Sequence, residues 1–173
     1  MEERQDNKYK IKKLLKVFDD ISDMLGGAGV IDYIAITPNE FSIHINQGIS
    51  MILFDELIKL EPIIYLDSIF FNENNPQLIV ANTALQDYKS QNANVMYLIN
   101  FVKSAAEFIC PCTGSEIHLL SNELRIFIDQ VNLSHEEYIG VYNLVDESTS
   151  IFKTVFDMQR PYISIMDRGT YDE

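Results

Sequence analysis

The sequence predicts an α+β protein in which helices cover one antiparallel sheet or two such sheets. Segments whose apolar residues recur at helical spacing alternate with paired segments in which apolar and polar residues take turns, which is typical of hairpins. The same order of helix, hairpin, helix and hairpin occurs twice along the chain. A tandem internal duplication explains this repetition.

Two pairs of segments carry the evidence for duplication. Residues 34–47 (IAITPNEFSIHINQ) align with residues 117–130 (IHLLSNELRIFIDQ), and six of the fourteen aligned positions are identical. Residues 71–82 align with residues 156–167 at nearly the same separation along the chain. Two matches in the same order and at nearly the same spacing indicate duplication more strongly than either match alone.

The expected repeats are residues 1–84, which include a basic N-terminal helix, and residues 94–173, with residues 85–93 as the connecting segment. We expect the two repeats to pack as one compact unit, because each is small for an independent core.

Residues 11–25 are the first expected helix. Their apolar side chains recur three and four residues apart, lysines occupy the other face, and Gly26 and Gly27 end the helix. The apolar stripe predicts that this helix docks onto the acidic remainder of the chain. The alternative is a free handle for an acidic partner or an anionic membrane.

The first expected hairpin lies within residues 34–45 and turns at residues 37–40. If Ile36 lies opposite Phe41 across this turn, then Tyr33 lies opposite His44, on the face away from the isoleucines. A helix over residues 49–60 and a hairpin of residues 63–71 and 77–83 complete the first repeat.

The second repeat follows the same order. Residues 95–109 are expected to be helical, and residues 116–129 form a hairpin in which His118 lies opposite Arg125. Ser134 and Glu137 then form a capping box at the start of the next helix, because each side chain can accept a hydrogen bond from a free backbone N–H. The last hairpin consists of residues 151–158 and 162–166.

Composition indicates a globular protein outside the membrane. The 173 residues are 47% hydrophobic and 23% charged, which are ordinary globular values. No apolar run is long enough to span a bilayer, and the charged N-terminus lacks the apolar core of a signal peptide. Two cysteines do not make a disulfide framework. We therefore expect a cytoplasmic protein with no membrane partner.

The charge is unevenly distributed. Residues 1–16 carry a net charge of +3, whereas the remaining residues carry −16, so the whole chain has −13. The acidic part repels phosphates and favours a basic protein partner, and we expect no nucleic-acid partner. Acidic surfaces also keep proteins soluble without binding anything, which is the simpler explanation.

The candidate catalytic residues form no recognisable constellation. His44 and His118 have no acid or nucleophile assigned to them by the sequence, so we expect them to face solvent or an interface. His135 lies within the capping box. Cys110 and Cys112 are expected to be loop cysteines; a soft metal site or a redox pair is the alternative, but the usual spacing and further ligands are missing.

We expect no cofactor and no metal, and the absence of a catalytic motif argues against an enzyme. The glycine-rich residues 26–29 follow a helix and precede a strand, which is the wrong order for a phosphate-binding loop. The strongest candidate is instead a surface. The expected partner-binding residues are Tyr33, His44, His118, Arg125 and Phe127, on the hairpin faces away from the isoleucines.

These hairpin faces mix aromatic, apolar and titratable groups, which is typical of an interface. The competing interpretation is that a helix covers them within the monomer. The leading functional hypothesis is a non-enzymatic, acidic protein-interaction module of the adaptor, chaperone or inhibitor type, which binds a basic protein or associates with itself. The alternative is a small-molecule-binding protein or an enzyme with a pocket between the two repeats. Mimicry of nucleic acid fits least, because the carboxylates are scattered.

Overall fold

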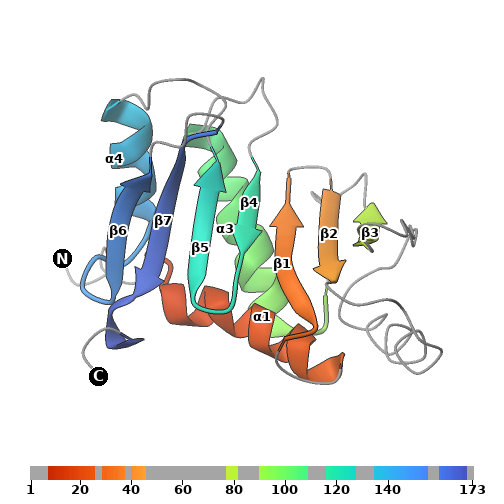
Figure 1. Ribbon diagram of the computed structural model, residues 1–173. Helices are drawn as coiled ribbons and strands as arrows, with labels where there is room; N and C mark the ends of the chain where they lie inside the picture. Colours follow the sequence, from red (N-terminus) through yellow and green to blue (C-terminus); the bar gives the residue numbers. More distant parts are fainter. Residues whose placement is uncertain are drawn as a thin grey trace.

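An antiparallel sheet with seven strands among the described residues forms the centre of a computed structural model of the chain (Figure 1). The strands are β1 (Ile31–Ile36), β2 (Glu40–Ile45), β3 (Gln77–Ala81), β4 (Ile117–Leu119), β5 (Glu123–Phe127), β6 (Ser150–Val155) and β7 (Tyr162–Asp167). Their order across the sheet is β3-β2-β1-β4-β5-β7-β6, and all neighbours are antiparallel. The sequence did not determine whether the strands form one sheet or two. The described strands form one sheet.

The structure describes residues 8–25, 29–37, 40–45, 77–81, 90–108, 116–127, 135–155 and 160–170. Several predicted features lie outside these ranges. They include the helix over residues 49–60, the strand over residues 63–71, Gly26 and Gly27, Cys110 and Cys112, and Ser134 of the capping box.

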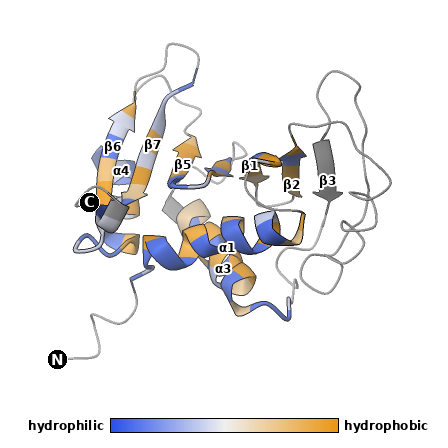
Figure 2. Ribbon diagram, turned by 60° about the horizontal axis from the view of Figure 1, so that its bottom comes forward, coloured by the Kyte–Doolittle hydropathy of each residue, from blue (hydrophilic) through white to orange (hydrophobic). Residues whose placement is uncertain are grey.

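The described helices are α1 (Ile11–Met24), α3 (Ala93–Phe108) and α4 (His135–Leu144), and a short 3-10 helix, Arg168–Thr170, follows β7. α1 and α3 begin and end within two residues of the predicted helices. They pack against each other on one face of the sheet, which Figure 2 shows with α1 in front, and α4 packs against α3. None of the described helices is both long and apolar enough to cross a membrane.

The predicted docking of α1 is confirmed. Ile11, Leu14, Val17 and Ile21 are completely buried and share one core with the isoleucines of the sheet. The N-cap residue Lys10 makes no side-chain capping hydrogen bond. Burial of an apolar side chain stabilises by about 1.5–3 kcal/mol, so packing onto the sheet, rather than capping, holds this helix.

The alternation of side chains along the strands fills the same core from the other side. Ile34, Ile36, Ile43, Leu124 and Ile126 are all completely buried beneath α1 and α3. A slip of one residue in any strand would move its apolar set to the other face. This burial therefore specifies the register of the sheet.

The predicted hairpin registers are confirmed. Tyr33 lies opposite His44 in the β1–β2 hairpin. His118 lies opposite Arg125 in the β4–β5 hairpin. All four side chains therefore lie on the face away from the buried isoleucines.

The two halves of the sheet use equivalent registers. β2 pairs with β3 so that Ile43 lies opposite Leu78, and β5 pairs with β7 so that Ile126 lies opposite Ile163. The two aligned pairs of segments match Ile43 with Ile126 and Leu78 with Ile163. The halves join where β1 and β4 run antiparallel, and the pairs Ile34–Leu119 and Ile36–Ile117 at this junction exchange places under the same alignment.

The buried faces of α1 and α3 are equivalent as well. When the first residue of α1 is aligned with Val95 of α3, every buried apolar position of α1 meets a buried apolar position of α3. The positions Ile11, Leu14, Leu15, Val17, Phe18 and Ile21 correspond in this order to Val95, Leu98, Ile99, Phe101, Val102 and Ala105. Each half therefore contributes one helix to the same layer of the core.

Candidate functional site

Five rings form a continuous row across the sheet, on the face away from α1 and α3. They belong to His44 of β2, Tyr33 of β1, His118 of β4, Phe127 of β5 and Tyr162 of β7. We call this set the aromatic row. It crosses both halves of the sheet, because the antiparallel pairing of β1 with β4 brings the two hairpins side by side.

Neighbouring rings in the aromatic row stack closely. The Tyr33 ring lies between two histidines, with ring centroids 4.1 Å from His44 and 4.4 Å from His118 and interplanar angles of 16° and 19°. His118 and Phe127 are 4.4 Å apart, and Phe127 and Tyr162 are 5.2 Å apart, both tilted. Both faces of the Tyr33 ring are therefore occupied, and a molecule approaching from solvent meets ring edges.

Two guanidinium groups lie over the end of the row on the second half. The Arg160 guanidinium carbon is 4.5 Å from the centroid of Phe127, and that of Arg125 is 4.9 Å from the centroid of Tyr162. Cations attract the negative faces of aromatic rings, so these contacts position both groups. Phe127 is consequently only 9% exposed despite lying on the open face.

Glu116 links the aromatic row to Arg160 through hydrogen bonds. Its carboxylate accepts a hydrogen bond of 2.6 Å from Nε2 of His118 and one of 2.7 Å from Nη1 of Arg160. The hydrogen bond from His118, opposed by burial and assisted by Arg160, lowers the pKa of Glu116 to about 2. Glu116 therefore stays ionised and holds together residues that are far apart in the sequence.

A second carboxylate balances the other arginine. Nη2 of Arg125 donates a hydrogen bond of 3.1 Å to Glu123, and its Nε lies 3.0 Å from the other carboxylate oxygen. The Ser164 hydroxyl donates to the same carboxylate at 2.6 Å. Although burial opposes the change, the hydrogen bonds from Arg125 and Ser164 lower the pKa of Glu123. Arg125 is therefore paired with Glu123 at this end of the face.

The expectation that the two histidines lack a nearby acid or nucleophile is wrong. The Ser42 hydroxyl lies 3.2 Å from Nε2 of His44, and Glu116 contacts His118. Both pairs are two residues apart within one strand region, and such residues share a face of a sheet. A spacing of two residues within a strand is therefore the sequence signal for both pairs.

The Ser42–His44 pair is poorly arranged for nucleophilic catalysis. Burial, with a smaller contribution from His118, lowers the pKa of His44, so its neutral ring can accept a proton from Ser42. However, Nδ1 of His44 has no hydrogen-bond partner within the described part of the chain, so no acid orients the ring there. Ser42 is only 5% exposed, and its hydroxyl also donates to the carbonyl of Ala35 at 3.4 Å.

The structure brings all five predicted partner-binding residues to one surface. Four belong to the aromatic row, and Arg125 contacts its last member. The sequence did not identify Glu116, Arg160 and Tyr162 as members of this site. Tyr162 begins a predicted strand, but the pairing of that strand with β5 had no signal in the sequence.

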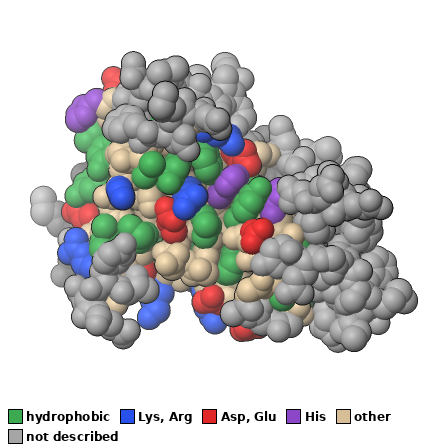
Figure 3. Space-filling model, viewed as in Figure 1, with side chains coloured by type: hydrophobic (Ala, Val, Ile, Leu, Met, Phe, Trp, Pro, Cys, Tyr) green, Lys and Arg blue, Asp and Glu red, His purple; other side chains and the backbone are tan. Residues whose placement is uncertain are grey.

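The described helices leave this face open. α1 and α3 pack on the opposite face, so neither of these two helices covers the hairpin faces. Figure 3 shows histidine, hydrophobic, basic and acidic side chains gathered over the centre of the sheet. The composition predicted for an interface is therefore present on an accessible surface.

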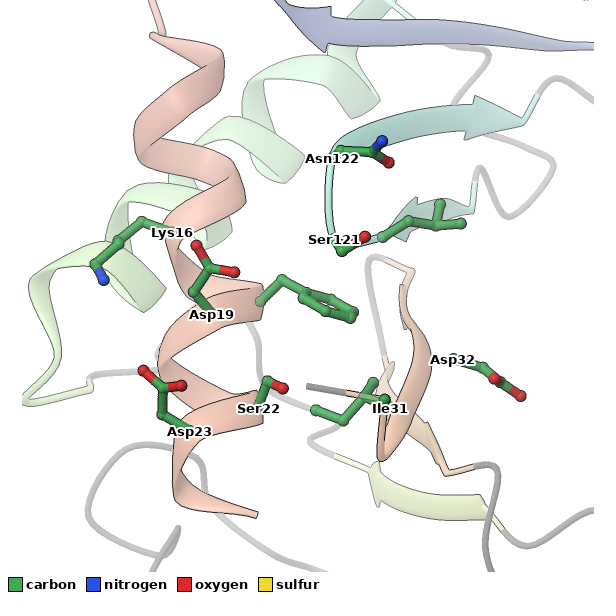
Figure 4. A pocket seen from close by; sticks show the side chains of 11 residues that line it. Lys16, Asp19, Ser22, Asp23, Ile31, Asp32, Ser121 and Asn122 are labelled. Carbon is green, nitrogen blue, oxygen red and sulfur yellow. The ribbon is translucent and has the colours of Figure 1, made fainter. Parts of the chain in front are cut away.

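A second feature is a hollow of about 460 Å³ between α1, the start of β1 and the turn between β4 and β5 (Figure 4). Phe18, Ile31 and Leu120 line its apolar part, and polar side chains that include Ser22 and Asn122 line the rest. The described residues around it include neither histidine nor cysteine. The hollow can accommodate a small molecule, but it offers no acid–base pair with a histidine or thiol.

Of the remaining candidates, Cys110 and Cys112 lie outside the described residues, and His135 lies within them. His135 begins α4 and is exposed. Within the ranges that the structure describes, no group of three histidine, cysteine, aspartate or glutamate side chains is arranged to hold a metal.

Comparison of the chain with protein-family models, with curated proteins and with solved structures finds no match.

Proposed function

We propose that this protein is a non-enzymatic, acidic interaction module that binds another protein through the aromatic row. One observation carries the proposal: rings from five strands, with two arginines, form a connected surface on the face that the described helices leave open. The open face of an antiparallel sheet is ordinarily polar. Tyrosine, phenylalanine and arginine are enriched in protein interfaces and in their energetic centres.

The stacking of the row favours binding because it restricts the side chains in advance. Immobilising a flexible side chain on binding costs about 0.5–1.5 kcal/mol, and rings that already pack against one another avoid much of this loss. Ring edges carry a partial positive charge, so they attract oxygen atoms or the faces of other rings. Because His44 and His118 occupy both faces of Tyr33, base stacking is disfavoured there, which supports a protein over a nucleic acid.

Charge has a separate role in this proposal. Within the face, Glu116 and Glu123 pair with Arg160 and Arg125, so the contact surface itself is close to neutral. The chain as a whole carries −13. A distributed negative charge accelerates the approach of a basic partner, whereas the aromatic contact determines how long the partner stays.

We also propose that the fold arose by tandem duplication of a helix–hairpin–helix–hairpin unit, as residues 1–84 and 94–173. The equivalent registers of β2–β3 and β5–β7 support this, as do the equivalent buried faces of α1 and α3. Duplication would place two related hairpins beside each other and so generate a binding face across their junction. A cytoplasmic location is in keeping with a chain of two cysteines.

The test is affinity capture from the native lysate with tagged wild-type protein and with the double variant His44→Ala and Phe127→Ala. We expect the wild type to retain a basic protein near one-to-one, with retention reduced as salt is raised. The double variant should lose at least ~30-fold in affinity for that protein, because one ring is removed from each half of the row.

Phe127 is largely buried, so loss of binding must be separated from loss of folding. Ile126→Ala is the matched control, since Ile126 precedes Phe127 in β5 but points into the core beneath the helices. It should lower the melting temperature and leave binding intact at a temperature where it is folded. Equal binding by the wild type and the double variant would contradict the assigned face.

A small-molecule-binding protein or an enzyme with a pocket between the two repeats is the second candidate. The hollow favours it, because α1 and β1 come from the first proposed repeat and the β4–β5 turn from the second. Failure of the wild type to retain any protein would favour this candidate over the first.

A further inference from the structure

The outward face of α1 carries an ordered pattern of charge. Lys12, Lys16, Asp19 and Asp23 are all exposed, and their spacings of four, three and four residues place them in one stripe along the helix. The N-terminal half of the stripe is basic and the C-terminal half is acidic. Figure 2 shows α1 at the front of the molecule, and Figure 4 shows Lys16 and Asp23 pointing away from the strands.

This order of charges does not stabilise the helix that carries it. The N-terminus of a helix has a partial positive charge and the C-terminus a partial negative charge, so lysines first and aspartates last is the unfavourable arrangement. The first turn of α1 contains no acidic residue, and the last turn contains no basic residue. The stripe therefore weakens the isolated helix, so stabilisation of the helix itself does not explain its order.

Few of these charges form ion pairs within the described part of the chain. Lys16 lies 3.5 Å from Asp20, one turn along the same helix. Lys12, Asp19 and Asp23 make no ion pair with the described residues. Within this part of the chain, nothing competes for three of the four charges when a second molecule approaches.

We propose that α1 is a self-association surface, on which α1 of a second copy of this chain packs antiparallel. The stripe is symmetric about the midpoint between Lys16 and Asp19. In an antiparallel pair, Lys12 therefore faces the partner's Asp23, and Lys16 faces the partner's Asp19. A two-fold axis repeats both contacts, so four ion pairs form over about 16 Å of helix.

A second copy fits this stripe better than an unrelated partner does. A purely basic partner would be repelled by the two lysines, and a purely acidic partner would be repelled by the two aspartates. Only a partner with the same charges in reverse order pairs with all four, and an antiparallel copy has that order by symmetry. Antiparallel alignment also places the opposite ends of the two helix dipoles together.

The proposed association is independent of the aromatic row. α1 covers the opposite face of the sheet, so a dimer through α1 leaves the row accessible in both copies. Exposed ion pairs are individually weak and are screened by salt. We therefore expect a reversible dimer that forms at low ionic strength and dissociates as salt is raised.

Charge reversal tests the pairing directly. Variant A carries Lys12→Glu and Lys16→Glu, which makes the stripe entirely acidic, and variant B carries Asp19→Lys and Asp23→Lys, which makes it entirely basic. Sedimentation equilibrium of the full-length chain should show a wild-type dimer and at least ~10-fold weaker self-association of each variant, because like charges then oppose one another. An equimolar mixture of A and B should form a heterodimer, since every facing pair is again opposite.

The control is the variant Lys153→Glu and Arg168→Glu, which changes the net charge as variant A does but alters two exposed residues outside α1. It should dimerise as the wild type does. A monomeric wild type at low salt would overturn the proposal. Homodimers of variant A alone or of variant B alone, as stable as the wild-type dimer, would overturn it too. So would an equimolar mixture of A and B that fails to associate. All substituted positions are exposed, so melting curves can verify that each variant is folded before it is measured.

Discussion

Glu116 is the residue on which the arrangement of the aromatic row depends most directly. It accepts hydrogen bonds from His118 in its own hairpin and from Arg160, which lies between β6 and β7, just before β7. Arg160 in turn lies over Phe127, and His118 stacks on Tyr33. One carboxylate thus connects three elements that the chain brings together only on folding.

Replacing this carboxylate with a neutral amide should destabilise the protein in a pH-dependent way. The folded-state pKa of Glu116, about 2, lies below the ordinary 4.5, so its stabilisation is complete above about pH 4.5 and is lost as the pH falls toward 2. The shift corresponds to roughly 3 kcal/mol, and solvent screening of a side chain that is 26% exposed reduces the expected effect of Glu116→Gln to about 1–2 kcal/mol at pH 7.

Urea unfolding between pH 7 and pH 3 measures this effect, and the gap between variant and wild type should narrow toward the acid end. Glu107→Gln is the control, because Glu107 is exposed near the end of α3 and should change stability by less than about 0.5 kcal/mol. A gap that stays constant with pH would contradict the role assigned to the ionised carboxylate.

At the scale of elements, α1 and α3 occupy equivalent places but are held differently at their starts. α3 has a side-chain cap: the Asn92 side-chain oxygen accepts hydrogen bonds from the backbone N–H groups of Asn94, at 2.9 Å, and of Val95, at 3.1 Å. α1 lacks such a cap at Lys10. Capping therefore contributes to α3, whereas α1 depends on the burial of its apolar face.

Asn92→Ala should lower the free energy of unfolding by about 1 kcal/mol, because two backbone donors at the start of α3 lose their acceptor. Chemical denaturation measures the loss. Asn92→Asp keeps an oxygen at the same place and should retain most of the wild-type stability. Similar losses in both variants would indicate that the cap is not the source of the effect.

At the scale of the whole molecule, both halves share one sheet and one core. β1 pairs with β4 across the junction, and α1 contacts β5 and β7 as well as β1. The first helix of the chain therefore covers strands from both halves. We expect the halves to unfold together, because α1 packs on strands of both halves in one core.

Deleting residues 1–25 should remove cooperative thermal unfolding, because the isoleucines beneath α1 would become exposed to water. Leu14→Ala perturbs the same core less severely. Leu14 is completely buried, so its truncation should lower the free energy of unfolding by about 2–5 kcal/mol. Thermal unfolding of both variants can be measured by circular dichroism. A deletion variant that melts like the wild type would show that α1 is not part of the cooperative core.

Much of the candidate site was predictable because it depends on local alternation. Once the turn of each hairpin is known, a period of two assigns Tyr33 and His44 to one face, and His118, Arg125 and Phe127 to the equivalent face. The contacts that make these residues one site were not predictable. Stacking of Tyr33 on His118 and pairing of Glu116 with Arg160 require neighbouring strands that are far apart in the sequence.

Local patterns in the sequence predicted the described helices and hairpins, the registers of β1–β2 and β4–β5, and the uneven charge of the chain. These properties depend on residues a few positions apart, whose spacing decides which side of a helix or strand is apolar. The tertiary structure alone decided that one sheet joins both halves through β1 and β4, that α1 and α3 share one face, and that the rings meet on the other. Those choices depend on the total apolar surface that distant segments bury together, and no local pattern encodes that quantity.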